Sequence, residues 1–186
     1  MRVLSVNVGL PRELEWNGKI VRTSISKQPV TGRVRVARLN VEGDQQSDLT
    51  VHGGPEKAVY AYPSEHYPFW RGELAKMDLA WGVFGENFTT TGLLEETLHI
   101  GDRVRIGSAE FVVTQPRMPC FKLGIRFNRS DMDSRYKSYK GYIAARKLAA
   151  CRNVTPLTFL TSASTFARAS AAIANIPCPT PRQALR

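Results

Sequence analysis

The sequence predicts a mainly β fold with a few short helices, because short alternating segments recur along it. Residues 2–8 and 33–39 alternate apolar and polar side chains and are rich in β-branched residues, which is typical of half-buried strands. The dipeptide Asn17-Gly18 is a strong hairpin signal. Residues 109–114 follow residues 98–107 at hairpin spacing. These patterns indicate a β-rich body.

The expected elements follow one another at short intervals. Strands are predicted at residues 2–8, 19–25, 33–39, 58–62, 98–107 and 109–114. A helix is predicted from Ser64 to about Lys76, and His66 within it is interpreted as a structural or exposed side chain and not as a ligand.

The segment 33–39 should have one buried and one solvated face, because its side chains alternate. Arg33 and Arg35 fall on the solvated face, and Lys27 is assigned to the same basic surface. This interpretation treats all three cations as ordinary surface charge.

Composition excludes several classes of protein. A chain of 186 residues is about one domain, with or without an appendage, and its 42% apolar and 23% charged residues are ordinary for a soluble globular protein. No stretch approaches the ~20 apolar residues of a membrane span, and the N-terminus has the pattern of a strand and not of a signal peptide. The three cysteines, at positions 120, 151 and 178, have neither metal-site spacing nor a disulfide framework. We therefore expect a cytoplasmic protein.

The net charge of +10 does not predict nucleic-acid binding once it is located. Residues 1–140 hold 20 Lys and Arg against 16 acids, whereas residues 141–186 hold six and no acid. A nucleic-acid binder usually concentrates its charge in a stripe with aromatic residues or on a recognition helix; the basic tail has neither pattern, and the body is only mildly basic. A mild positive bias suits a phosphate-bearing small ligand instead.

A cysteine between two prolines and two cations is the strongest chemical signal. Cys120 lies in Gln115-Pro116-Arg117-Met118-Pro119-Cys120-Phe121-Lys122, just past an expected strand. A thiol reacts as its thiolate, which nearby Arg or Lys side chains favour. The prolines fix their own φ angles and stiffen the turn. Taken alone, the segment is equally compatible with a buried structural thiol.

Two further polar segments are candidates for a site. His52-Gly53-Gly54 lets backbone N–H groups approach an anion without an obstructing Cβ, and Lys57 adds charge nearby. Gly85-Glu86-Asn87 lies between aromatic residues, an arrangement suited to a polar pair at the edge of a core. Each signal is weak by itself, since an ordinary turn or a satisfied carboxylate explains it equally well.

Four groups of residues occur in one order along the chain. They are Gly43-Asp44 to Tyr60 with Gln46, Asp48-Leu49, Val51-His52-Gly53-Gly54 and Lys57; Phe84-Gly85-Glu86-Asn87; Ile100-Gly101-Asp102; and Gln115-Pro116-Arg117 with Pro119-Cys120. Together they resemble the MOSC domain family, which is named after the C-terminal domain of molybdenum-cofactor sulfurases. The chain looks most similar to the stand-alone YiiM-type members, over about residues 1–142. The resemblance implies a mainly β, barrel-like fold with a few helices.

The resemblance also implies chemistry at the cysteine. In this family the position that Cys120 matches is taken to carry sulfur or to ligate the molybdenum of a pterin cofactor. YiiM-type relatives are linked to the reduction of N-hydroxylated compounds such as N-hydroxylaminopurines, which implies a molybdenum-dependent oxidoreductase with a small-molecule substrate. A soft thiolate is a sensible ligand for such a metal. The sequence shows no flavin, haem or iron–sulfur motif, so we expect a separate electron-donor protein.

The pterin of the molybdenum cofactor carries a phosphate. The resemblance therefore implies that residues of the matching motifs contact the cofactor. Arg117, Lys57 and Lys122 are expected to contact the anion, and Glu86 and Asn87 the pterin ring edges. The full set of expected cofactor-binding residues is His52, Gly53, Gly54, Lys57, Glu86, Asn87, Gln115, Arg117 and Lys122. An exposed edge of the β structure would allow a homodimer.

The end of the chain departs from the family pattern. Residues 143–186 are rich in Ala, Ser, Thr, Arg and Pro and contain no acid. We expect a MOSC-like domain at residues 1–142 and an atypical basic tail at residues 143–186 that is partly helical, at Ser164–Ala174, or disordered. A swapped, processed or frameshifted tail would explain the change of composition.

Two alternatives to the reductase stay open. In a sulfur carrier, Cys120 would hold a persulfide for the assembly of a metal–sulfur cluster or a cofactor. A non-enzymatic binding module would instead bind nucleic acid in a strongly salt-dependent way and hold no cofactor.

Overall fold

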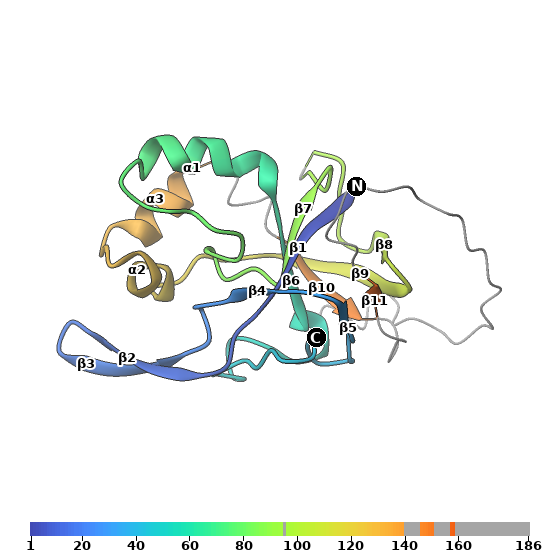
Figure 1. The fold of residues 1–186 in the computed structure, drawn as a ribbon, viewed down its shortest axis with the longest axis horizontal. Helices are drawn as coiled ribbons and strands as arrows, with labels where there is room; N and C mark the ends of the chain where they lie inside the picture. The colour runs from blue at the N-terminus through green and yellow to red at the C-terminus, as the bar shows by residue number, and fades with distance from the viewer. Residues whose placement is uncertain (95, 140–145, 151–156, 159–186) are drawn as a thin grey trace.

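A seven-stranded mixed sheet forms the centre of the computed structural model, which describes residues 1–94, 96–139, 146–150 and 157–158 (Figure 1). Its strands run in the order β4-β1-β7-β6-β10-β9-β8. In that order the bounds are Gln28–Val30, Arg2–Val8, Phe88–Thr91, Val59–Pro63, Arg146–Ala150, Ala109–Pro116 and Arg103–Ile106. The pair β6–β7 is parallel and the other described pairs of this sheet are antiparallel.

Two smaller sheets and a few short helices complete the described fold. The hairpin β2–β3 joins Arg12–Trp16 to Lys19–Thr23, and β5 (Arg33–Val34) pairs with β11 (Leu157–Thr158). The helices are η1 (Pro55–Lys57), η2 (Ser64–His66), α1 (Tyr67–Glu73), α2 (Lys122–Phe127) and α3 (Met132–Ser138). As predicted, the described chain consists mostly of strands with a few short helices. Its pairings leave β4 and β8 as unpaired edges, so closure into a barrel is not confirmed.

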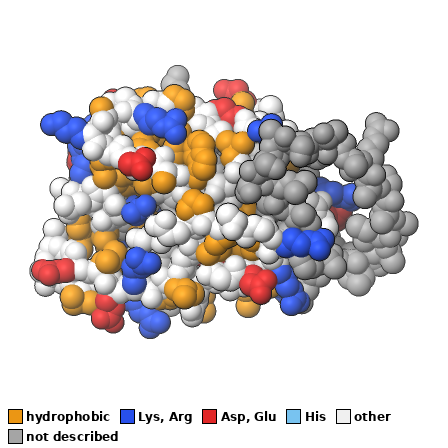
Figure 2. All heavy atoms as spheres, in the orientation of Figure 1, with side chains coloured by type: hydrophobic (Ala, Val, Ile, Leu, Met, Phe, Trp, Pro, Cys, Tyr) orange, Lys and Arg blue, Asp and Glu red, His pale blue; other side chains and the backbone are white. Residues whose placement is uncertain are grey.

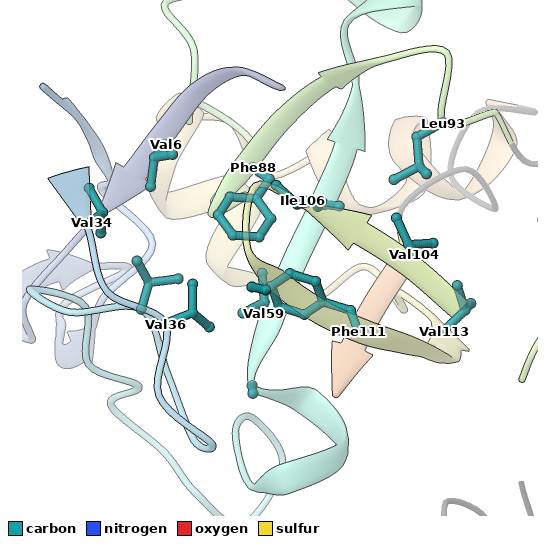
Figure 3. Close-up of a cluster of buried hydrophobic side chains, with 14 residues drawn as sticks. Val6, Val34, Val36, Val59, Phe88, Leu93, Val104, Ile106, Phe111 and Val113 are labelled. Atoms are coloured by element: carbon teal, nitrogen blue, oxygen red, sulfur yellow. The ribbon is translucent and has the colours of Figure 1, made fainter. Parts of the chain in front are cut away.

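Two hydrophobic cores support these elements. Valines from several strands pack around Phe88 and Phe111 in the first core, where the two aromatic rings meet edge to face (Figure 3). The second core is aromatic and lies where α1, α2 and α3 gather at one end of the sheet (Figure 1). In it Tyr62, Trp70 and Tyr136 are almost fully buried. The strands and helices on either side of the connecting loops are therefore anchored by one of the two cores.

The hairpin prediction is confirmed, because Asn17 and Gly18 both adopt positive φ, at 51° and 71°. A two-residue turn of this kind matches the twist of its strands and needs residues that tolerate that region. The alternation around β5 is also confirmed, with Val34 buried and Arg33 exposed. The strand itself is much shorter than residues 33–39, because within the described part of the chain its ladder pairs are limited to Arg33–Val34.

Three expectations need correction. Lys27 is not on the solvated surface, since its side chain is buried against Asp44. The helix expected from Ser64 to Lys76 is two short pieces that end at Glu73. The strand expected at residues 98–107 is limited to Arg103–Ile106. In each case tertiary contacts decide how far the local pattern extends.

Strand β10 lies in the middle of the main sheet, between β6 and β9. Leu148, for example, pairs with Val59 on one side and Val113 on the other. The division into two regions at residue 142 stays a prediction, but the sheet extends beyond it to Ala150. The helix expected at Ser164–Ala174 lies outside the described residues.

Candidate functional site

A pocket opens where five loops and strands meet beside β6. It encloses about 620 Å³, counting the part open to solvent. Its walls come from the segment after β3, the loop between β5 and η1, Tyr60 of β6, the loop before β7 and the loop between β9 and α2. The lining residues are Thr23, Ser24, Ile25, Lys27, Asp44, Gln45, Gln46, Ser47, His52, Gly53, Lys57, Tyr60, Gly85, Asn87, Arg117, Cys120 and Lys122.

Seven of the ten site residues expected from the sequence line this one pocket. They are His52, Gly53, Lys57, Asn87, Arg117, Cys120 and Lys122. Gly54, Glu86 and Gln115 are not among its lining residues. The expected residues are spread over seventy positions of sequence, so the fold is what brings them together.

Cys120 lies on the loop between β9 and α2, with its side chain partly exposed. Its carbonyl oxygen accepts a hydrogen bond of 2.9 Å from the Leu123 N–H, in the first turn of α2. The neighbouring Pro119 is buried. The thiol is therefore held on an anchored turn and faces the pocket while remaining accessible.

Two buried cations face the same pocket. Arg117 and Lys122 are each only 8% exposed. The Arg117 guanidinium lies 4.3 Å from the centroid of the Tyr60 ring, a favourable cation–π distance. Within the described part of the chain, neither side chain makes a hydrogen bond or an ion pair with an acidic residue. Since a buried cation is costly unless it is paired, both are suited to an anion from outside the chain.

The hydroxyl of Ser24 also lines the pocket without a described hydrogen-bond partner. Its Oγ is buried and has no partner within the described chain. A buried hydroxyl of this kind normally finds a partner in a ligand or an ordered water molecule. The pocket therefore offers a neutral donor beside its cations.

A third cation, Lys27, is fixed by an acidic side chain. Its ammonium pairs with Asp44, whose carboxylate also accepts hydrogen bonds of 2.8 Å from the Gly9 N–H and from Asn87 Nδ2. Burial lowers the pKa of Lys27, and the charge of Asp44 opposes that shift. In the sequence, Asp44 was visible only as part of a polar turn. The alternation of residues 33–39 led us to place Lys27 on the solvated face, and it gave no sign that Lys27 is buried.

Asn87 connects the pocket to the main sheet. Its Oδ1 accepts a hydrogen bond of 3.1 Å from the Tyr60 N–H, and its Nδ2 donates to the Asn7 carbonyl at 3.2 Å as well as to Asp44. Both side-chain atoms are thus committed to the fold. Asn87 lines the pocket mainly as a support for Asp44 and Tyr60.

Glu86 is fully buried beneath the pocket and does not line it. Its carboxylate accepts hydrogen bonds from the Tyr67 hydroxyl, from Thr89 Oγ1 at 2.8 Å and from the N–H groups of Gly82 and Phe84 at 2.8 and 3.1 Å. Burial raises the pKa of Glu86, and these donors oppose the shift. The carboxylate therefore orders the loop before β7.

The two glycines after His52 shape the wall of the pocket. Gly53 and Gly54 have φ of 99° and 86°, a region that favours glycine. A Cβ on Gly53 would lie 2.8 Å from Leu49 Cδ2, which is too close. Lys57 donates to the Val51 carbonyl at 3.3 Å and so closes the same loop. Gln115 instead lies within β9, paired with Lys147 of β10.

The pocket is strongly cationic. Lys27, Lys57, Arg117 and Lys122 line it against one acid, Asp44. Among the described residues no group of three or more His, Cys, Asp or Glu is placed to hold a metal ion.

The sequence profile of the MOSC domain matches residues 48–151, more than half of the chain and most of the pocket's walls. The chain belongs to the MOSC domain family. The MOSC domain is 49% identical over 130 residues to the uncharacterized protein YflK of Bacillus subtilis, covering 70% of this chain and 58% of YflK. It is 42% identical over 113 residues to the protein YiiM of Escherichia coli, covering 59% and 50%.

A more distant relative carries the name reductase. This protein of Gibberella moniliformis is 37% identical over 128 residues, which are 67% of this chain and 22% of the reductase. The crystal structure of YiiM from Geobacillus stearothermophilus superimposes with a TM-score of 0.62 at 28% identity, covering 86% of this chain and 75% of that one. The MOSC domain thus has a YiiM-like fold, and it spans about half the length of its bacterial relatives. No helix in the described ranges is long and apolar enough to span a membrane.

Proposed function

We propose that this MOSC domain binds a molybdenum cofactor and acts as a cytoplasmic oxidoreductase that reduces N-hydroxylated small molecules. One observation carries the proposal: an accessible thiol, Cys120, shares a pocket with two buried cations, Arg117 and Lys122, that form no ion pair with an acid within the described residues. Cys120 would be the molybdenum ligand, since thiolates are soft ligands. The name of the reductase relative and the YiiM-like fold support an oxidoreductase role.

The cofactor phosphate would be held by the cations that lack a described acidic partner, Arg117 and Lys122. Arg is well suited because its guanidinium offers two parallel donors to a phosphate. Lys57 and His52 would stand at the other wall, and Ser24 Oγ would donate a hydrogen bond. The ion pair of Lys27 with Asp44 would keep a further positive charge at the pocket without leaving an unpaired ion.

Reduction of an N–OH group consumes two electrons and two protons and yields N–H and water. When bound, the cofactor would supply this two-electron chemistry. The residues of the chain would hold the substrate beside Cys120 and keep its polar end among the cations. The electrons would come from a separate donor protein, since the sequence contains no flavin, haem or iron–sulfur motif.

The reductase proposal is tested with protein purified from a host that makes the cofactor. Loaded protein should reduce an N-hydroxylated compound with reduced methyl viologen as an artificial electron donor. Cys120→Ser should abolish the reaction, whereas Cys178→Ser, which changes another thiol, should keep it. Equal activity of Cys120→Ser and the parent protein would refute the role of Cys120.

The partial exposure of Cys120 favours one alternative, a sulfur carrier. An accessible thiolate can take up a sulfur atom from a donor persulfide and pass it on. Mass spectrometry of the purified protein would then show a thiol-reducible gain of one sulfur atom on Cys120. Molybdenum-dependent reduction without this adduct would leave the oxidoreductase as the function.

A further inference from the structure

Lys27 is a buried cation of the pocket that the proposed binding of the cofactor phosphate does not use. Its side chain is 9% exposed and pairs with Asp44, whose side chain is 1% exposed. Because Asp44 balances its charge, Lys27 needs no anion from outside the chain, unlike Arg117 and Lys122. The ammonium is therefore available for a task other than holding a phosphate.

The Lys27 ammonium has hydrogen-bond donors to spare. An ammonium carries three N–H groups, and Asp44 is its one acceptor among the described residues. The Lys27 side chain lines the same pocket as Cys120. Its other protons are therefore available to a small molecule that binds in the pocket beside the thiol.

The surroundings of Lys27 favour the release of a proton. Burial lowers the pKa of Lys27. Asp44 opposes this shift by its charge and its hydrogen bond, and more distant charges act in both directions, Arg117 lowering the pKa and Glu86 raising it. A lysine whose pKa moves down towards neutral pH becomes an effective proton donor. The Arg117 guanidinium cannot take this part, because an arginine side chain keeps its proton.

We propose that Lys27, held in place by Asp44, is the general acid of the reduction. This inference rests on the proposed reductase function. Lys27 Nζ gives a proton to the hydroxyl oxygen as the N–O bond breaks, so that water leaves and not hydroxide. The two electrons supplied by the donor protein remain on the nitrogen, which takes the second proton from solvent. The pocket is open to solvent, which then returns a proton to the Lys27 amine.

The first test measures the reduction of an N-hydroxylaminopurine by loaded protein, with reduced methyl viologen as donor and kcat expressed per bound molybdenum. Lys27→Arg keeps the positive charge but cannot release a proton. It should retain molybdenum and lower kcat about 10²- to 10⁴-fold, the usual loss without a general acid, with little change in KM. The matched control is Lys137→Arg on α3, where a lysine pairs with Asp133 at 2.7 Å outside the pocket. This control should keep the kcat of the parent protein.

The second test follows the proton itself. The kcat of the parent protein should fall as pH rises through the pKa of Lys27, because the amine form has no proton to give, and Lys27→Arg should lack this fall. A readout without turnover uses cofactor-free protein in which the lysines carry an NMR-active carbon isotope. The Lys27 Cε signal, assigned by its loss in Lys27→Arg, should titrate with a pKa below the ordinary 10.5.

The outcomes separate this inference from the reductase proposal. If Lys27→Arg keeps the kcat of the parent protein, or if Lys27 titrates at or above its ordinary pKa, Lys27 is not the general acid and the reductase stands. A Lys27→Arg variant without molybdenum would assign Lys27 to cofactor retention and overturn the inference. If that variant does not fold, the fall of kcat with pH in the parent protein decides. A loaded parent protein that reduces no N-hydroxylated compound would refute both proposals.

Discussion

The ion pair of Lys27 and Asp44 joins four separate segments at the pocket, since Asp44 also accepts hydrogen bonds from Gly9 and Asn87. A buried pair of this kind adds little net stability compared with apolar residues, but removing one partner leaves an uncompensated charge. The pair is therefore best understood as a device that fixes a positive charge in place.

Asp44→Ala should lower the free energy of unfolding by about 3–5 kcal/mol, because it strands the Lys27 ammonium in a buried site. Urea denaturation followed by circular dichroism measures the change. The control is Glu110→Ala, which breaks the exposed pair with Arg105 and should cost about 1 kcal/mol or less. The double variant Lys27→Met with Asp44→Ala should recover part of the loss; no recovery would mean that the charge of Lys27 is not the cause.

Glu86 gives a prediction for pH. Burial raises its pKa in the folded protein above the ordinary value of 4.5, so folding favours the protonated form. Between the unfolded and the folded pKa the native state binds more protons, and stability therefore falls as pH rises through this window.

Glu86→Gln removes this titration and keeps the shape of the side chain. It should be less stable than the parent protein near pH 4.5, because its amide meets a donor at Phe84 or Gly82. The difference in free energy of unfolding should shrink as pH rises above 4.5, since only the parent protein loses stability there. A difference that grows with pH would contradict the raised pKa, because it would mean that the hydrogen-bond donors lower the pKa of Glu86 by more than burial raises it.

At the scale of elements, helix α2 connects the hairpin β2–β3 to the pocket. Gly124 of α2 lies against the ring of Trp16 from β2, and a Cβ there would approach Trp16 Cζ2 to 3.2 Å and the Arg129 carbonyl to 2.9 Å. The same helix begins at Lys122, two residues after Cys120. The hairpin thereby supports the segment that carries the thiol.

Gly124→Ala should destabilise the protein by about 1–3 kcal/mol, because the added methyl has no room next to a backbone carbonyl. Thermal denaturation measures this loss. Gly72→Ala is the matched control: its Cβ meets nothing within 4 Å on α1, so the better helix propensity of Ala should raise stability by up to about 1 kcal/mol. Similar effects of the two changes would refute the close packing at Gly124.

The sequence predicted elements best where a local rule decides. Asn17-Gly18 specifies its turn through backbone conformation alone, and alternation at Val34 and Val36 identifies a buried face. Cys120 was expected after a strand and lies after β9. Lys27 was misread because its burial depends on Asp44, a partner far away in sequence that no local pattern shows. The hydrogen bond from Tyr67 to the buried Glu86 was likewise not visible in the sequence.

At the scale of the whole molecule, strand β10 connects the two parts of the described sheet, because it lies between β6 and β9 and pairs with both. The loops after β9 and before β6 carry most of the pocket. Cys120 and Lys57 can therefore line one pocket only if β10 is in place. The composition of the chain after residue 142 gave no sign of this central position.

Lys147→Pro should prevent cooperative folding, because proline removes a backbone donor from a strand that is paired on both sides. Strand β4, at the edge, already contains Pro29, as edge strands tolerate. The control Gln28→Pro on that edge should keep a cooperative thermal transition. A folded Lys147→Pro variant would contradict the central placement of β10.

The molybdenum and pterin content of purified protein tests the central claim most directly. Protein from a cofactor-producing host should hold stoichiometric molybdenum and pterin, and so should Cys178→Ser. Cys120→Ser should remain folded and lose its molybdenum. A folded parent protein without molybdenum, or a Cys120→Ser variant that retains all of it, would contradict the assignment of Cys120 as the metal ligand.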